Sequence, residues 1–166
     1  MEKKNSGGKP GTATFAAGCF WGVESVFMKA RGVKETSAGY TGGGFEKPTY
    51  EDVCSDETGH AEAVQIKFNP KEVSYEKLLA VFFNNHNPTT MNRQGPDVGT
   101  RYRSAIFYHD EEQKKAAKKF IEKLEKEKRF SKPIVTQIMK AQEFFKAEKC
   151  HQKYYRKKGI EPTCHI

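Results

Sequence analysis

The chain has 166 residues, of which 36% are hydrophobic and 12% aromatic, so it can bury one core and is most simply a single domain. Its apolar runs are shorter than the roughly 20 residues that a membrane helix needs, which argues against a membrane partner. The net charge of +8 comes largely from residues 114–129, where glutamates alternate with lysines. That pattern favours a solvated helix face over a nucleic-acid surface, so we expect no nucleic-acid partner.

Residues 1–11 carry charges and glycines but no apolar segment. They therefore predict a flexible N-terminal tail rather than a secretory signal, and we expect the protein in the cytoplasm. Residues 12–166 are expected to form a single domain, with a mobile C-terminal segment from about 145 to 166.

The first half of the chain alternates between strand and helix patterns. Residues 12–18, "TATFAAG", predict a short strand that ends at glycine. Residues 20–30 predict a helix that Gly32 ends, because one apolar face recurs at helical spacing through Val23, Val26, Phe27 and Ala30. Residues 33–43 predict a strand that runs into a glycine-rich loop, and residues 61–68 predict a third strand.

The second half begins with a helix from the N-cap Ser74 to about Asn85. A long polar loop follows, of a kind that is often functional. Residues 103–109 predict a strand, and Asp110 with Gln113 predicts a capping box for a helix over 111–129. Residues 133–139 predict a last strand. We expect an α+β two-layer sandwich: a mixed or antiparallel sheet flanked by helices, with a ferredoxin-like core and a long coiled C-terminal tail.

The four cysteines are Cys19, Cys54, Cys150 and Cys164, and no two of them form a C-x-x-C pair. This spacing argues against a zinc ribbon and against a thioredoxin-type motif. In a reducing compartment they are also not expected to be a disulfide framework.

Cys19 lies where the first strand gives way to the first helix. The helix N-terminus offers backbone N–H groups that would stabilise a thiolate, the reactive form of cysteine. Gly18 and Gly22 allow a tight bend and a close approach by substrate. Phe20 and Trp21 point about 100° apart on a helix, so they suggest one wall of an apolar pocket beside the thiol. The alternative is that Cys19 is a small core residue.

Several long segments give the sequence a family resemblance. "GCFWG" followed by "VE" resembles the active-site segment of the A-type peptide methionine sulfoxide reductases. The likeness continues in that family's order from about Thr12 to His165, through "GYTGG" at 39–43, "PTYEDVCSDETGHAEAV" at 48–64, "NRQGPDVGTRYRSAI" at 92–106 and "AEKCHQKYY" at 147–155. The resemblance implies reduction of the S epimer of methionine sulfoxide, in oxidised proteins or peptides.

The resemblance also implies a role for each matched residue. Cys19 would be the nucleophile, and Phe20 and Trp21 would hold the methyl group of the sulfoxide. The sulfoxide oxygen would be protonated or hydrogen-bonded by the remaining catalytic set, which is Glu62, Tyr50 and Tyr102, supported by Asp97.

Chemistry explains why such a set is needed. Sulfoxide sulfur is a poor electrophile until its oxygen is protonated or strongly hydrogen-bonded. A carboxyl group that burial keeps neutral can donate that proton, and phenol O–H groups add donors where negative charge develops. Taken alone, Glu62 would rather be a solvent-facing carboxylate, the two tyrosines surface-to-core residues, and Asp97 a turn residue after Pro96.

Attack on the sulfoxide would leave Cys19 as a sulfenic acid, which a second thiol must condense with before a dithiol can restore the enzyme. We rank Cys164 first as this resolving cysteine, Cys150 second and Cys54 last. Electrons would come from thioredoxin, and we expect a monomer without a cofactor or metal.

Two other functions stay open at this point. Cys19 paired with His60 could serve another thiol enzyme, such as a thiol peroxidase or an acyl-transfer enzyme. The dipeptides Cys150-His151 and Cys164-His165 could supply metal ligands, although their spacing matches no familiar zinc pattern.

Overall fold

The computed structural model describes residues 10–159 of the chain, so residues 1–9 of the proposed 1–11 tail and the last seven residues, Cys164 among them, lie outside the described part. In chain order its elements are β1 (Gly11–Ala17), α2 (Phe20–Met28), β2 (Val33–Thr41), α3 (Tyr50–Cys54), β3 (Ala61–Phe68), α4 (Tyr75–Asn84), β4 (Arg93–Gln94), β5 (Asp97–Val98), the 3-10 helix η1 (Thr100–Tyr102), β6 (Ser104–Tyr108), α5 (Glu111–Lys126), β7 (Gln137–Lys140), β8 (Phe145–Lys146), the 3-10 helix η2 (Lys149–His151) and α6 (Tyr154–Lys158).

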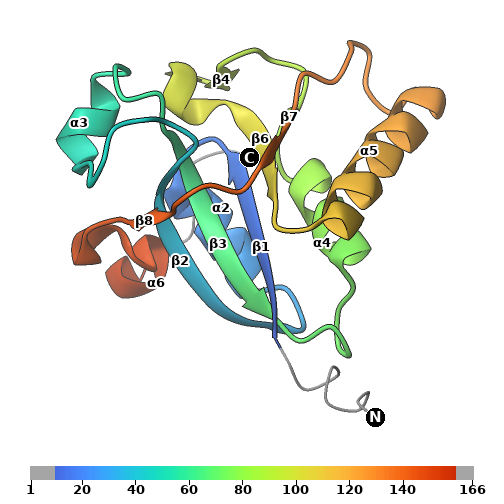
Figure 1. The fold of residues 1–166 in the computed structure, drawn as a ribbon, viewed down its shortest axis with the longest axis horizontal. Coiled ribbons are helices and arrows are strands. Elements are labelled where there is room, and N and C mark those ends of the chain that lie inside the picture. The colour runs from blue at the N-terminus through green and yellow to red at the C-terminus, as the bar shows by residue number, and fades with distance from the viewer. Residues whose placement is uncertain (1–9, 160–166) are drawn as a thin grey trace.

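A six-stranded sheet in the order β7-β6-β1-β3-β2-β8 forms the centre of the molecule (Figure 1). β6 and β7 run parallel, whereas β1–β3, β1–β6, β2–β3 and β2–β8 are antiparallel. The four inner strands and the helices between them, α2 and α4, have β-α-β-β-α-β connectivity, as in a ferredoxin-like unit. The α+β class and the mixed sheet expected from the sequence are therefore confirmed.

One face of the sheet carries the main core, which α2, α4 and α5 cover. Phe15 on β1 is fully buried at its centre. Its ring stacks on Phe27 of α2 at 5.3 Å and on Phe82 of α4 at 5.1 Å between ring centroids. Burying aromatic rings of this size stabilises the fold by about 2–3 kcal/mol for each side chain. This packing holds α2, which follows Cys19, against the sheet.

The segment of the chain between β7 and β8 covers the opposite face of the sheet. Small residues line it, and the segment from β7 to β8 crosses over them to the far edge of the sheet (Figure 1). Contact is so close at Gly39 of β2 that a Cβ there would lie 2.5 Å from the ring of Phe144. The small side chains that allow this crossing are Ala16, Ala61, Ala63 and Ala105.

The expectation of a long coil at the C-terminus is wrong for its described part. Residues 145–159 contain β8, η2 and α6. β8 pairs with β2, and the Gln152 side chain receives the Ala38 N–H and donates to the Ala38 carbonyl, both at 2.8 Å. A two-residue strand held by one side-chain amide has no periodic pattern, so the sequence does not indicate it.

Predicted element boundaries differ from the observed ones at a few ends. β1 begins at Gly11, which pairs with Phe68, one residue before the expected strand and within the proposed tail. α5 ends at Lys126, because Lys128 has a positive φ of 54°. Its N-cap Asp110 does accept from the Gln113 N–H at 2.8 Å. Gln113, however, receives the N–H of His109 rather than that of the cap, so the box is not reciprocal.

Of the other two predicted helices, one ends two residues early and one agrees with its prediction. The last strand is shorter than predicted and begins further along the chain. α2 ends at Met28 rather than at 30. Ser74 caps α4 as expected, accepting from the Lys77 N–H. β7 covers residues 137–140 instead of 133–139. The sequence analysis missed α3, β4 and β5, which are two to five residues long.

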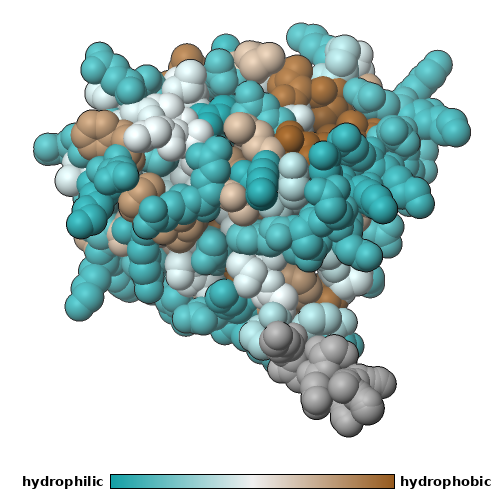
Figure 2. Space-filling view, in the orientation of Figure 1, coloured by the Kyte–Doolittle hydropathy of each residue, from teal (hydrophilic) through white to brown (hydrophobic). Residues whose placement is uncertain are grey.

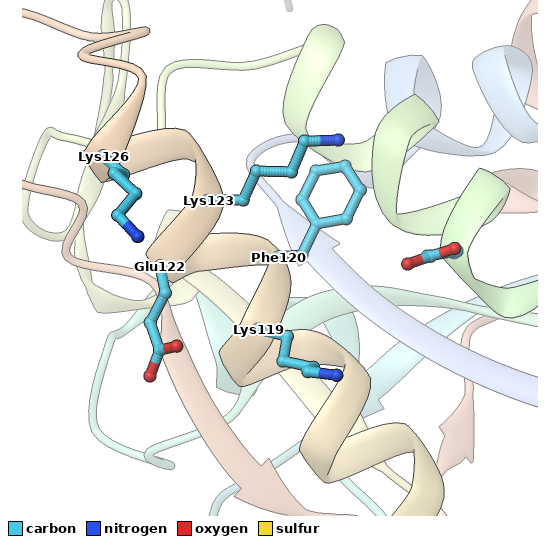
Figure 3. Close-up of a pocket in the computed structure, with 6 residues that line it drawn as sticks. Lys119, Phe120, Glu122, Lys123 and Lys126 are labelled. Carbon is cyan, nitrogen blue, oxygen red and sulfur yellow. The ribbon is translucent and has the colours of Figure 1, made fainter.

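The lysine-rich face of α5 is exposed, as its sequence predicts. Figure 2 shows a largely hydrophilic surface on this side of the molecule, with a hydrophobic area beside α5. A surface groove of about 660 Å³ lies along the helix, and Figure 3 shows Phe120 there between Lys119 and Lys123. The groove shares no residue with the thiol-containing segment, so it is not where the cysteine chemistry takes place.

The burial of His86 leads to a prediction of how the stability of the fold depends on pH. Its Nδ1 contacts the Phe82 carbonyl at 2.7 Å, its Nε2 contacts Ser104 Oγ at 2.8 Å, and burial lowers its pKa from 6.5 to about 4. Between pH 6.5 and 4 the unfolded chain therefore binds a proton at His86 that the folded chain does not bind. The free energy of unfolding decreases as pH falls through this range. Urea unfolding at several pH values should show a slope about 1 kcal/mol per pH unit flatter in His86→Asn than in the wild type. Equal slopes would contradict this assignment.

Candidate active site

Cys19 is the N-cap residue of α2, so the helix begins where the sequence predicts. Its backbone carbonyl receives the Val23 N–H at 3.3 Å, and its side chain is partly exposed. Gly18 before it has a φ of +98°, in the left-handed region that favours glycine. A Cβ at that position would lie 2.8 Å from Cγ of Gln94, so the chain bends tightly under the 87–99 loop just before the thiol.

Glu62 on β3 is 1% exposed, so its interpretation as a solvent-facing carboxylate is wrong. It lies opposite Tyr40 on β2, and its Oε1 accepts the Phe20 N–H at 3.1 Å. This N–H is one of the unpaired donors at the start of α2. The bond brings the carboxyl group next to the residue that follows Cys19.

Tyr50 and Tyr102 come from different elements and both face Glu62. Tyr50 is the first residue of α3, and Tyr102 is the last residue of η1. Burial, followed by the negative charge of Glu62, raises the pKa of Tyr102 to about 12. The same two causes raise the pKa of Tyr50, and the neighbouring Cys54 thiol adds to them. Both phenols are therefore protonated at neutral pH and can donate hydrogen bonds.

Asp97 is less directly involved. It lies on β5, where it pairs with Gln94, and its charge contributes to raising the pKa of Tyr102. Asp97 is partly exposed, and its effect on the pKa of Tyr102 indicates that the two side chains lie near each other.

The two aromatics beside the thiol have different surroundings. Phe20 is 1% exposed and packs against Tyr40 and Tyr50, at 5.6 and 6.5 Å between ring centroids. Trp21 is partly exposed and stacks on Tyr154 of α6 at 3.8 Å. The expectation that they cannot face one core patch agrees with this arrangement, since Phe20 points into the core and Trp21 lies partly exposed against α6.

His151 and Glu148 belong to the site, although the sequence analysis gave them no role in it. The His151 ring lies 4.3 Å from Tyr50 and 5.8 Å from Trp21, and its Nδ1 accepts the Trp21 indole N–H at 3.0 Å. Burial lowers the pKa of His151, so the ring is neutral and can accept this bond at neutral pH. The only sequence signal was the family-like segment 147–155.

Glu148 ties the same segment to the tyrosines. Its two carboxylate oxygens accept the Tyr40 hydroxyl and the Tyr50 N–H, each at 3.0 Å. Burial opposes ionisation, but these hydrogen bonds prevail and lower the pKa of Glu148. Glu148 is therefore an ionised anchor for Tyr50.

The glutamate of the first motif, Glu24, holds the C-terminal segment from the other side. It is fully buried, and its carboxylate accepts the Thr36 hydroxyl and the Lys153 N–H, each at 2.7 Å. The Lys153 ammonium lies 4.0 Å away. A buried carboxylate needs such partners, so this contact fixes α6 and Tyr154 against α2.

The other sulfur and imidazole groups considered from the sequence have surroundings of their own within residues 10–159. Cys54 ends α3, and Cys150 is exposed in η2. His60, the partner for another thiol chemistry, is 1% exposed, and its Nδ1 and Nε2 contact the Gly43 N–H and the Phe45 carbonyl. Both nitrogens are engaged by the backbone, so His60 has none left for Cys19.

A metal centre gains no support from the described residues. Among them, no three His, Cys, Asp or Glu side chains gather as metal ligands. His151 already receives the Trp21 N–H through Nδ1. Cys164 and His165, the other half of the set considered from the sequence, lie outside the described part.

A partly exposed thiol, a buried carboxyl group and two protonated phenols on an α+β sheet define a thiol-dependent site with hydrogen-bond donors. A model of the family described as peptide methionine sulfoxide reductase matches residues 11–166. The peptide methionine sulfoxide reductase MsrA of Acidobacterium capsulatum is 57% identical over 154 residues, which are 93% of this chain and 98% of that one.

Solved structures agree with the sequence comparison. Mxr1 from Saccharomyces cerevisiae in its reduced form matches with a TM-score of 0.89 at 34% identity, over 96% of this chain and 92% of that one. Mxr1 in complex with Trx2 matches with a TM-score of 0.63 at 27% identity, over 89% and 86% of the two chains. The chain belongs to the peptide methionine sulfoxide reductase family, and its activity is the A-type one, reduction of the S epimer of methionine sulfoxide.

The strained glycine before the thiol gives a test of the site geometry. Gly18→Ala should lose about 2 kcal/mol of stability, because alanine is disfavoured at this φ and its Cβ would meet Gln94. Displacement of Cys19 should also slow sulfoxide reduction about 10-fold or more. Gly44→Ala is the matched control, since a Cβ there meets nothing within 4 Å and should change neither quantity. Thermal unfolding and initial rates measure both effects, and a fully active Gly18→Ala would refute the geometric argument.

Proposed function

We propose that Cys19 is the nucleophile and that Glu62, Tyr50 and Tyr102 act on the sulfoxide oxygen, with Asp97 in support. The observation that carries this proposal is the bond from the Phe20 N–H to Glu62, which joins the start of the helix bearing Cys19 to a buried carboxyl group. Tyr50 and Tyr102 support it as well, because both lie near enough to Glu62 for its ionised form to raise their pKa values. In the proposed reaction Glu62 starts protonated and becomes that ionised carboxylate when it gives up its proton.

The first step transfers one oxygen atom and two electrons. The Cys19 sulfur attacks the sulfoxide sulfur, and protonated Glu62 gives its proton to the sulfoxide oxygen. The oxygen then passes, as a hydroxyl group, from the substrate sulfur to the Cys19 sulfur. The S–O bond of the substrate and the S–S bond formed by the attack both break, an S–O bond to Cys19 forms, methionine leaves as a thioether, and Cys19 is left as a sulfenic acid. Tyr50 and Tyr102 donate hydrogen bonds where negative charge develops on the oxygen.

Phe20 and Trp21 form the site for the methyl group. Trp21 has its indole plane held by the bond to His151 and by the stack on Tyr154. A rigid apolar wall on one side and oxygen donors on the other accept only one handedness at sulfur. This supports selectivity for the S epimer.

The second half of the cycle needs another thiol. We assign Cys164 as the resolving cysteine, with Cys150 as second choice. Its thiol would attack the sulfenic sulfur of Cys19, which forms a disulfide and releases water, and thioredoxin would then reduce the disulfide. The structural likeness to Mxr1 in complex with Trx2 supports thioredoxin as the reductant.

Substrates would be oxidised proteins or peptides that contain methionine sulfoxide, so the role is repair of oxidative damage by a single catalytic domain over residues 12–166. We propose a monomer that works in the cytoplasm. Within residues 10–159 no helix is long and apolar enough to cross a membrane.

Turnover of separated epimers tests the first step. The wild type should reduce methionine S-sulfoxide and leave the R epimer unchanged. Cys19→Ser should reduce neither, because serine cannot take the oxygen. Product is measured as methionine by chromatography. Equal activity in Cys19→Ser would end the assignment of the nucleophile.

Single-turnover stoichiometry tests the resolving cysteine. Cys164→Ser should still form one methionine per enzyme but should lose recycling by thioredoxin, because no disulfide can form. Cys54→Ser is the control and should recycle normally. Full recycling by Cys164→Ser would refute the assignment, and loss of recycling in Cys150→Ser alone would transfer the role to Cys150.

A further inference from the structure

An ion pair outside the matched catalytic set lies between the two phenols' elements. The Arg101 guanidinium contacts Asp56 at 2.8 Å between Nη1 and Oδ2. The same Nη1 donates to the Cys54 carbonyl at 3.2 Å, and the Arg101 N–H donates to Asp56 Oδ1 at 3.3 Å. The two side chains are only 17% and 32% exposed, so solvent screens this pair less than a typical surface pair.

This ion pair connects the segments that carry Tyr50 and Tyr102. Tyr50 opens α3, whose last residue is Cys54, and Asp56 follows directly after that helix. Arg101 immediately precedes Tyr102 in η1. One side chain therefore joins the C-terminal end of α3 to η1, and through them it links two phenols that are 52 positions apart in the sequence.

The local backbone is shaped to make this contact. Asp56 has a positive φ of 61°, a conformation that aspartate tolerates better than most residues. Gly99, at a φ of +141°, lies against the Asp56 carboxylate, because a Cβ there would be 2.6 Å from Oδ2. The Asp56 carboxylate is thus packed closely against Gly99, at the start of η1.

We propose that Arg101 is a positioning residue for the sulfoxide-reducing step: by gripping Asp56 and the Cys54 carbonyl, it holds Tyr102 and Tyr50 at a fixed separation around Glu62. The inference rests on the proposed donor roles of these two phenols. Arg101 would not contact the substrate, but it would set the positions of the two phenol donors.

The guanidinium has a second effect on Tyr102. It lies 4.5 Å from the centroid of the Tyr102 ring. Burial and the charges of Glu62 and Asp97 raise the pKa of Tyr102, whereas Arg101 lowers it. A phenol with a lower pKa is a stronger hydrogen-bond donor. Arg101 thus offsets part of the rise in the pKa of Tyr102 that Glu62 and Asp97 cause.

Coupling between Arg101 and Tyr102 is the measurable consequence. In a single-turnover assay, Arg101→Gln should lower the rate constant at saturating substrate about 10-fold and leave the half-saturating concentration within about twofold, because placement of the donors and not substrate binding is lost. In a Tyr102→Phe background, the same substitution should lower the rate less than about threefold, since the phenol that Arg101 adjoins directly is already gone and Tyr50 is reached only through α3.

Three further variants make the test decisive. Lys34→Gln removes an exposed ion pair to Glu72, at 3.0 Å, and should leave the rate unchanged. Asp56→Asn keeps the side-chain shape and should cause the same loss of rate as Arg101→Gln. It replaces Arg101→Gln in the test if thermal unfolding shows that Arg101→Gln folds poorly. A full 10-fold loss in the Tyr102→Phe background would overturn the positioning role. An unaltered rate in Tyr102→Phe and Tyr50→Phe would instead overturn the proposed donor roles of the phenols.

Discussion

The hydrogen bond from the Phe20 N–H to Glu62 is the contact on which the rest of the site depends. A helix N-terminus has unpaired N–H groups, and a buried carboxyl group needs hydrogen-bond donors. Here each supplies what the other lacks. The bond also joins β3 to the turn between β1 and α2, so the thiol and the carboxyl group, 43 positions apart, are held together by main-chain geometry. The remaining side chains of the site are arranged around this pair.

The C-terminal segment is the second structural condition, because it completes the aromatic surface from the other end of the chain. Glu24, Gln152 and Glu148 tie it to α2, β2 and α3 respectively. The contacts of Glu24 and Gln152 use partly buried polar groups, and such groups are costly to leave unpaired, whereas the bond from the Tyr50 N–H to Glu148 is exposed. The His151 ring is thereby placed between Trp21 and Tyr50. The pocket wall therefore depends on a segment about 130 residues downstream of the thiol.

How far the sequence predicts this structure depends on the range of the interaction. β3, the cap of α4 at Ser74 and the start of α2 follow from local patterns, and the structure confirms them. The burial of Glu62 does not follow, because its strand is buried on both faces and its alternation is therefore weak. α3 is too short for a helical period, and β8 and η2 depend on partners more than 100 positions away. Only the family resemblance indicated that these distant segments meet.

Charge divides the work among the acidic and phenolic groups. Glu148 has donors from Tyr40 and Tyr50 and stays ionised, so it serves as an anchor. Burial and nearby carboxylates raise the pKa values of Tyr50 and Tyr102, so each phenol keeps its proton and can donate a hydrogen bond. A phenolate could not stabilise oxygen that becomes negative, whereas a phenol can. Negative surroundings thus keep both tyrosines in the protonated form that their proposed donor roles require, and the Arg101 guanidinium lowers the pKa of Tyr102 without reversing this effect.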